Sequence, residues 1–80
     1  MNVRVYVTLK PEVLDPQGKA VEGGLKRLGF QEVEGARVGK FIQLKLNETR
    51  EEVAKTRVKE MCEKLLSNPV IENVRYEFTD

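Results

Sequence analysis

The chain has 80 residues, of which 40% are hydrophobic and 34% are charged, so it is long enough for one domain and is typical of an ordered globular protein. Fourteen basic and thirteen acidic side chains give a net charge of +1, which disfavours strong attraction to nucleic acid or to an anionic membrane. The chain has no histidine and one cysteine. A histidine-based catalytic triad and an ordinary zinc site are therefore excluded.

The first two predicted elements are a strand and a helix. Residues 2–9 alternate between apolar and polar side chains, which predicts a half-buried strand. Asp15 is a good N-cap, Pro16 suits the first helical position, and apolar residues then recur at helical spacing. Gly29 is expected to end this helix in a left-handed conformation. The stretch "LDPQG" is thus a helix start, because the glycine-rich pattern of a phosphate-binding loop is missing.

Two adjacent glycines lie inside this predicted helix. Gly23 and Gly24 weaken it by roughly 1 kcal/mol each relative to alanine. Gly24 shares the apolar side of the helix with Val21 and Leu28, so we expect it to allow the close approach of a sheet or another helix. The sequence offers no comparable reason for Gly23.

Residues 31–46 fit two structures. Val33 has the opposite parity to the later apolar residues of this segment, Val38, Ile42, Leu44 and Leu46. A single strand would therefore place Val33 on the wrong face unless the chain turns or bulges near Gly35. A hairpin would give the element order βαββαβ, and one bent strand would give βαβαβ. Both alternatives remain open on the sequence alone.

A second helix and a last strand complete the pattern. Thr49 and Glu52 match a capping box, which predicts a helix start. An apolar stripe follows as far as Leu65 and includes Cys62, which is expected to be a buried small hydrophobe. Pro69 prevents the helix from continuing. Residues 72–78 alternate again and predict the final strand.

These elements predict one α+β domain over residues 1–80. We expect a ferredoxin-like-related βα(β)βαβ sandwich in which both helices pack on one face of a mainly antiparallel sheet, and in which the small core favours oligomers. No apolar run approaches the roughly 18 residues that span a bilayer, and the first residues lack the apolar region of a signal peptide. A cytoplasmic location is the expectation, with no membrane partner.

The other sheet face is expected to be open and to carry aromatic rings among charged groups, notably Tyr6 and Phe41. A protein interface is the favoured interpretation, since Tyr, Phe and Arg commonly anchor such contacts. A solvated face is the second interpretation. The third is RNA binding, because "VGKFIQL" loosely resembles a base-stacking strand of RRM domains, although the remaining pattern and the charge do not fit. A ligand-binding regulatory module is a further alternative.

Three blocks of sequence, "LKPEVLDPQGKAV", "RVGKFIQL" and "VKEMCEKLLSNPVIENVRYEF", resemble the PurS family, the small subunit of phosphoribosylformylglycinamidine (FGAM) synthase. The likeness covers essentially the whole chain and departs at Asn73 and Val74. It implies a non-catalytic subunit in purine biosynthesis that joins the large ATP-dependent synthetase subunit (PurL) to the glutaminase subunit (PurQ) and supports ammonia transfer. It also implies a homodimer or tetramer, with ATP and magnesium used by the large subunit and no cofactor bound here.

The sequence and the resemblance together predict no catalytic residue, no cofactor site and no metal site in this chain. Instead they indicate residues that contact other subunits. The interface candidates are Tyr6, Asp15, Gln17, Gly18, Arg37, Gly39, Lys40, Phe41 and Asn68.

Overall fold

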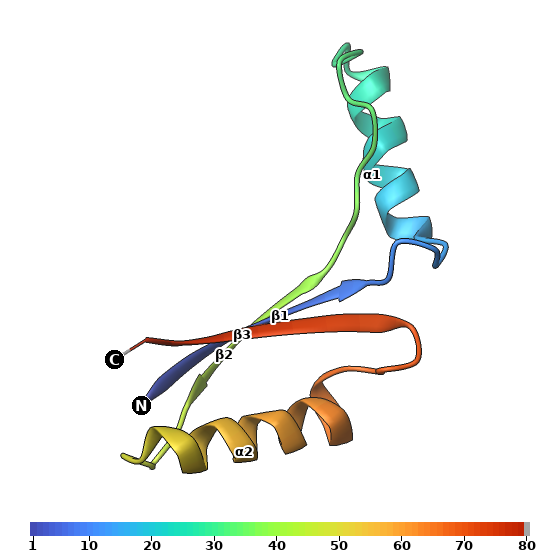
Figure 1. The fold of residues 1–80 in the computed structure, drawn as a ribbon. Helices are drawn as coiled ribbons and strands as arrows, with labels where there is room; N and C mark the ends of the chain where they lie inside the picture. The colour runs from blue at the N-terminus through green and yellow to red at the C-terminus, as the bar shows by residue number, and fades with distance from the viewer. Residues whose placement is uncertain (80) are drawn as a thin grey trace.

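The computed structural model describes residues 1–79 and has the order βαβαβ (Figure 1). Its elements are β1 (Asn2–Leu9), α1 (Pro16–Arg27), β2 (Lys40–Lys45), α2 (Glu51–Met61), a π-helical turn (Cys62–Leu66) and β3 (Glu72–Thr79). The predicted α+β class is confirmed. Of the two alternatives for residues 31–46, the shorter order is correct, because residues 31–39 form no strand.

The three strands form one antiparallel sheet with β1 in the middle. Val5 lies opposite Ile42 on β2 and Tyr76 on β3. Tyr6, the next residue, lies opposite Phe41 and Arg75. Since alternate residues of a strand point to opposite faces, the two predicted faces of the sheet are confirmed.

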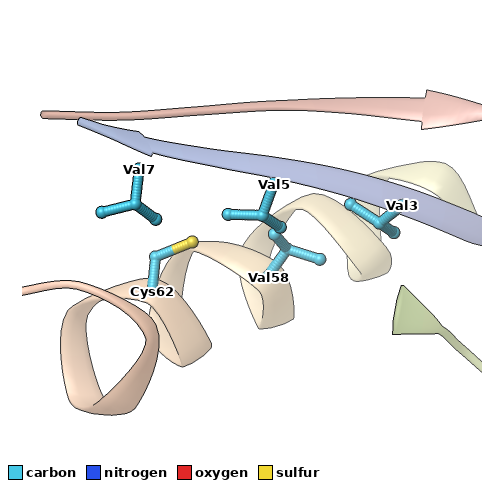
Figure 2. Close-up of a cluster of buried hydrophobic side chains, with 5 residues drawn as sticks. All are labelled: Val3, Val5, Val7, Val58 and Cys62. Atoms are coloured by element: carbon cyan, nitrogen blue, oxygen red, sulfur yellow. The ribbon is translucent and has the colours of Figure 1, made fainter. Parts of the chain in front are cut away.

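The hydrophobic core lies between β1 and α2. Figure 2 shows valines of β1 above Val58 and Cys62, and the buried cluster consists of Val3, Val5, Val7, Val58 and Cys62. The predicted burial of Cys62 is confirmed, since its exposed fraction is 2%. α2 therefore covers the apolar face of the sheet, which leaves the other face without a helix (Figure 1).

The start of α2 differs from the predicted capping box. Thr49 is not the N-cap, and the N-cap residue Arg50 makes no side-chain capping bond. The Glu48 carboxylate accepts the backbone N–H groups of Thr49 and Arg50, both at 3.1 Å. An acceptor one residue earlier thus satisfies the free N–H groups that precede the helix.

The prediction that both helices pack on one face of the sheet is wrong for α1. This helix projects away from the sheet (Figure 1), and within residues 1–79 none of the buried hydrophobic side chains belongs to it. The radius of gyration is 16.0 Å, whereas a compact chain of this length would have about 12 Å. The protomer is therefore extended, with α1 as an arm.

Two further observations concern the described residues, 1–79. Neither helix has the length and apolar character that a bilayer-crossing segment needs. No buried side-chain nitrogen or oxygen lacks a hydrogen-bond partner in that part of the chain.

Candidate protein-interaction surfaces

The base of the arm is fixed by Asp15, which is 4% exposed. One carboxylate oxygen accepts the Gly18 backbone N–H at 2.9 Å, so Asp15 is the predicted N-cap of α1. The other oxygen accepts the Val38 backbone N–H at 2.8 Å. One side chain thereby joins the start of α1 to the segment that leads into β2.

Arg37 strengthens the same junction from the other side. Its guanidinium donates to the backbone carbonyls of Lys10 and Val13 at 2.9 and 3.1 Å. The guanidinium also lies 3.9 Å from the Asp15 carboxylate. The segments that enter and leave the arm are consequently tied together beyond the end of β1.

Two glycines permit close backbone contacts near this junction. A Cβ atom on Gly18 would collide with the carbonyl oxygen of Ala36 and with the Asp15 carboxylate. A Cβ atom on Gly39 would lie 2.6 Å from the carbonyl oxygen of Val7. Both glycines are thus required by packing inside the chain. We call the set Asp15, Gly18, Arg37, Val38 and Gly39 the junction.

The electrostatics of the junction favour an ionised carboxylate. The backbone N–H of Val38, followed by that of Gly18, holds the pKa of Asp15 below its ordinary value of 3.8. Burial opposes this shift, and the charge of Arg37 assists it. At neutral pH Asp15 therefore acts as a fixed hydrogen-bond acceptor and not as a proton carrier.

The open face of the sheet carries the second group of candidates. The rings of Tyr6 and Phe41 stack with centroids 5.2 Å apart. The Arg75 guanidinium lies 4.1 Å from the centre of the Tyr6 ring, a cation–π contact. We call Tyr6, Phe41 and Arg75 the aromatic platform. A nucleic-acid base stacking on Tyr6 would have to displace one of these neighbours.

One hydrogen bond and two ion pairs hold the aromatic platform in place. The Tyr6 hydroxyl donates to the Glu77 carboxylate at 2.9 Å. Arg4 and Arg75 each lie 3.7 Å from the same carboxylate. Phe41, on the edge strand β2, remains 54% exposed beside these groups. An exposed ring on a rigid support is typical of an anchor residue in a protein interface.

The remaining candidates lie at the end of the sheet nearest the junction. Gln17, Gly39 and Lys40 line a cavity of about 190 Å³. The Lys40 ammonium lies 3.9 Å from the Glu72 carboxylate. Asn68 shapes the turn before β3, where its side-chain oxygen accepts the Val70 N–H at 3.1 Å. The structure thus divides the nine candidates between the junction, the aromatic platform and this end of the sheet.

The apolar side of α1 is a surface whose exposure the sequence did not reveal. Val21 is 46% exposed and Leu28 is 75% exposed, and Gly24 and Leu25 lie between them on the same side of the helix. We call this side, Val21, Gly24, Leu25 and Leu28, the arm stripe. The feature of the sequence that could have indicated this exposed side of α1 is the pair of glycines inside the helix.

The total exposed area is larger than expected for a compact monomer. The accessible surface is 6110 Å², whereas a compact monomer of 9.2 kDa would expose about 4,900 Å². The excess, about 1,200 Å², exceeds the roughly 800 Å² that each partner contributes to a stable interface.

An apolar groove runs beside α2 on the helix-covered side of the sheet. Its volume is about 390 Å³. The apolar residues that line it are Leu44, Met61, Leu65 and Leu66, with charged groups at the rim. Leu65 is 83% exposed. We call this the α2 groove.

Two observations concern the possible metal ligands and the thiol of the described residues. Within 1–79 there is no group of three or more Cys, Asp or Glu side chains placed to hold a metal ion. Burial, and secondarily the charge of Glu63, raises the pKa of the Cys62 thiol, so this thiol is protonated and a poor nucleophile at neutral pH. The arrangement is suited to docking.

The model of the PurS family, described as phosphoribosylformylglycinamidine (FGAM) synthase, matches residues 2–80. The PurS subunit of Synechocystis sp. is 49% identical over 98% of this chain and 78% of its own length. The PurS subunit of Bacillus subtilis is 49% identical over 95% of this chain and 89% of its own.

Solved structures show the same likeness. The crystal structure of B. subtilis PurS aligns with a TM-score of 0.89 and 47% identity, covering 99% of this chain and 98% of that one. A chain in the structure of PurLQS from Thermotoga maritima aligns with a TM-score of 0.86 and 33% identity, covering 95% and 93%.

Proposed function

The chain belongs to the PurS family of FGAM synthase subunits, and from this premise we propose that it is the non-catalytic subunit that joins a glutaminase subunit to a synthetase subunit. Its partners are the counterparts of PurL and PurQ, as the name of the similar T. maritima structure, PurLQS, suggests. The product of such a complex is an intermediate of purine biosynthesis. We expect this complex to act in the cytoplasm.

The observation that carries this proposal is the excess of exposed surface. This 80-residue chain exposes about 1,200 Å² more surface than a compact monomer of its mass. The excess area is available for contacts with other proteins. The aromatic platform lies on β1, β2 and β3, whereas the arm stripe lies on α1 and its C-cap residue Leu28. Two separate surfaces suit a subunit that contacts more than one neighbour.

The chemistry explains why a bridging subunit is useful. The glutaminase releases ammonia, and free ammonia is largely protonated near neutral pH, so that its nucleophilic lone pair is lost. The nitrogen must therefore pass between active sites without equilibrating with water. This chain contributes by holding the two enzymes together. This chain binds no cofactor, and the large subunit uses ATP and magnesium.

We also propose that the chain self-associates, as a homodimer or tetramer. A core of six buried hydrophobic residues among those described, 1–79, gives a small domain little stability of its own. Association with a second copy would cover apolar surface that one protomer leaves exposed.

The test is a reconstitution with purified synthetase and glutaminase subunits from the same organism. Glutamine-dependent FGAM formation is measured with and without this chain. We expect strong stimulation with glutamine and none when a high concentration of ammonium salt replaces glutamine, because added ammonia bypasses the bridge. Equal glutamine-dependent rates in both mixtures would defeat the proposal.

A further inference from the structure

We propose that the open face of the sheet docks an acidic surface of one of the two partner enzymes, with an apolar side chain on Phe41 and a carboxylate between Arg4 and Lys45. This inference rests on the proposed function and assigns one contact surface, with its chemistry, to it. The open face is the side of the sheet opposite to α2 (Figure 1).

The first argument is the charge of the open face. The strand register places four charged side chains there, which are Arg4, Lys45, Arg75 and Glu77. Three are basic and one is acidic, so these strand residues carry +2, whereas the whole chain carries +1. The positive charge is therefore concentrated on this face, and a partner surface of complementary potential is acidic.

The second argument is that these cations are only partly neutralised. Arg4 and Arg75 each lie 3.7 Å from the same Glu77 carboxylate, which also accepts the Tyr6 hydroxyl. The side chains of Arg4 and Arg75 remain 48% and 68% exposed. Lys45 is exposed and forms no ion pair with any other residue in the range 1–79. All three cations can form charge-assisted hydrogen bonds with carboxylates of a partner.

The third argument is a hollow at the end of the sheet that can receive a carboxylate. Its volume is about 370 Å³, and it is lined by Arg4 and Lys45 together with Asn2 and Gln43. All four side chains carry N–H donors. Phe41 lies four residues from Lys45 along β2, which corresponds to about 13 Å. An extended partner segment of the same length can cover Phe41 and also reach the hollow.

The charge and the ring contacts disfavour two other occupants. Two copies that met through their open faces would bring +2 against +2, and like charges across an interface repel. A nucleic-acid base would have to stack on Tyr6, whose ring already contacts Phe41 and Arg75 at 5.2 and 4.1 Å. An acidic protein surface can use Phe41 and the cations in the positions that they already occupy.

The experiment compares Lys45→Glu with Lys59→Glu. Both changes reverse the charge of an exposed lysine, but Lys59 belongs to α2 on the opposite side of the sheet. Biolayer interferometry gives the dissociation constant for the synthetase and for the glutaminase, each alone and in the presence of the other. We expect Lys45→Glu to raise the constant for one enzyme at least ~10-fold and Lys59→Glu to change neither. No effect of Lys45→Glu, or equal effects of the two variants, would overturn the proposal.

Salt dependence distinguishes an electrostatic contact from a local structural defect. Between about 0.05 and 0.5 M salt the screening length falls from roughly 14 to 4 Å. The ratio of the dissociation constants of Lys45→Glu and the unmodified chain should therefore fall toward unity as salt is added. A ratio that does not respond to salt would contradict the proposal.

A measurement on the unmodified chain needs no substitution. Acetylation of the lysine amines, followed by mass spectrometry, compares the free chain with the three-protein complex. The reaction of Lys45 should slow at least ~5-fold on assembly, because an interface excludes water and reagent from its centre. Lys59 should react at its original rate. Unchanged acetylation of Lys45 in the complex would show that the open face is not covered.

The outcomes separate this inference from the proposed function. If the chain binds neither enzyme, the proposed function fails and this surface assignment fails with it. If glutamine-dependent reconstitution succeeds and Lys45→Glu changes no binding constant, only the surface assignment fails. If Lys45→Glu instead weakens self-association, or the binding of a uridine homopolymer, the open face has one of the other occupants and the proposal is overturned.

Discussion

Asp15 and Val38, 23 positions apart in the chain, are joined by a hydrogen bond of 2.8 Å from the Val38 backbone N–H to the Asp15 carboxylate. This bond fixes where α1 leaves the sheet. Residues that resemble a family signature, Asp15, Gly18 and Arg37, thereby have a structural role inside the chain. They hold the base of the arm in place.

Gly39→Ala should destabilise the fold. The added Cβ would lie 2.6 Å from the Val7 carbonyl oxygen, so β1 and the chain entering β2 must separate, which costs about 1–3 kcal/mol. Gly35→Ala is the matched control, because nothing lies within 4 Å of its Cβ position. Urea denaturation measures both. A Gly39→Ala protein as stable as the Gly35→Ala protein would show that the close contact is not needed.

Acid should weaken the junction. Because the folded-state pKa of Asp15 lies below 3.8, its stabilisation is present above about pH 4 and is lost as the pH falls through the lowered pKa. Glu48 acts in the same direction, since the backbone N–H of Arg50 lowers its pKa from 4.5. Melting temperatures between pH 7 and pH 2 measure the effect of both groups.

Replacement of Asp15 isolates its share of this pH dependence. Asp15→Ala should lower the melting temperature at pH 7 by roughly 5–10 °C, and the difference from the unmodified chain should shrink toward pH 2. Glu34→Ala is the control, because Glu34 is exposed and lies near the same junction. Parallel melting curves for Asp15→Ala and the unmodified chain over the whole pH range would contradict the role of the ionised carboxylate.

Cys62 should be unreactive in the folded protein. Burial raises its pKa and leaves 2% of the residue exposed, so a thiol reagent should react only as fast as the chain opens. Cys62→Ala should lower the free energy of unfolding by about 1 kcal/mol through lost packing against Val7. Rapid labelling of the native chain, at the rate seen in urea, would disprove this burial.

Phe41 should matter more for assembly than for folding. Phe41→Ala removes a ring that is 54% exposed, so stability should fall by about 1 kcal/mol or less. If the aromatic platform contacts a partner subunit, binding should weaken at least ~10-fold. Gln43→Ala, two residues along the same face, is the control. Equal affinity of the Phe41→Ala and unmodified chains for both partner subunits would exclude this surface.

The strands and the start of α1 could be predicted because local signals agree with the final structure. Alternation in β1 and β3 fixed the two faces, and Asp15 with Pro16 marked the start of α1. The α2 start was misjudged at Thr49, because Glu48 also offers an acceptor to the same N–H groups. Competing caps one residue apart cannot be ranked from residue type alone.

The position of α1 could not be predicted from its pattern. An amphipathic stripe indicates that the apolar face of a helix will be buried. It does not indicate whether the burying surface belongs to the same chain or to another. The contacts that send α1 away, such as Asp15 to Val38, join residues whose pairing no local rule predicts. Among the site candidates, Tyr6 and Phe41 were predicted to share one face of the sheet, and the strand register confirms this. The N-cap role of Asp15 was also predicted, whereas its bond to Val38 and the contacts of Arg37 to Lys10 and Val13 were not.

Sedimentation velocity on a mixture of this chain with its synthetase and glutaminase counterparts, supplied with glutamine, ATP and magnesium, would determine whether it works by holding them together. We expect one fast species that contains all three proteins and that disappears when this chain is omitted. A synthetase and a glutaminase that sediment together without it, while this chain remains in its own slow boundary, would show that it is no bridge.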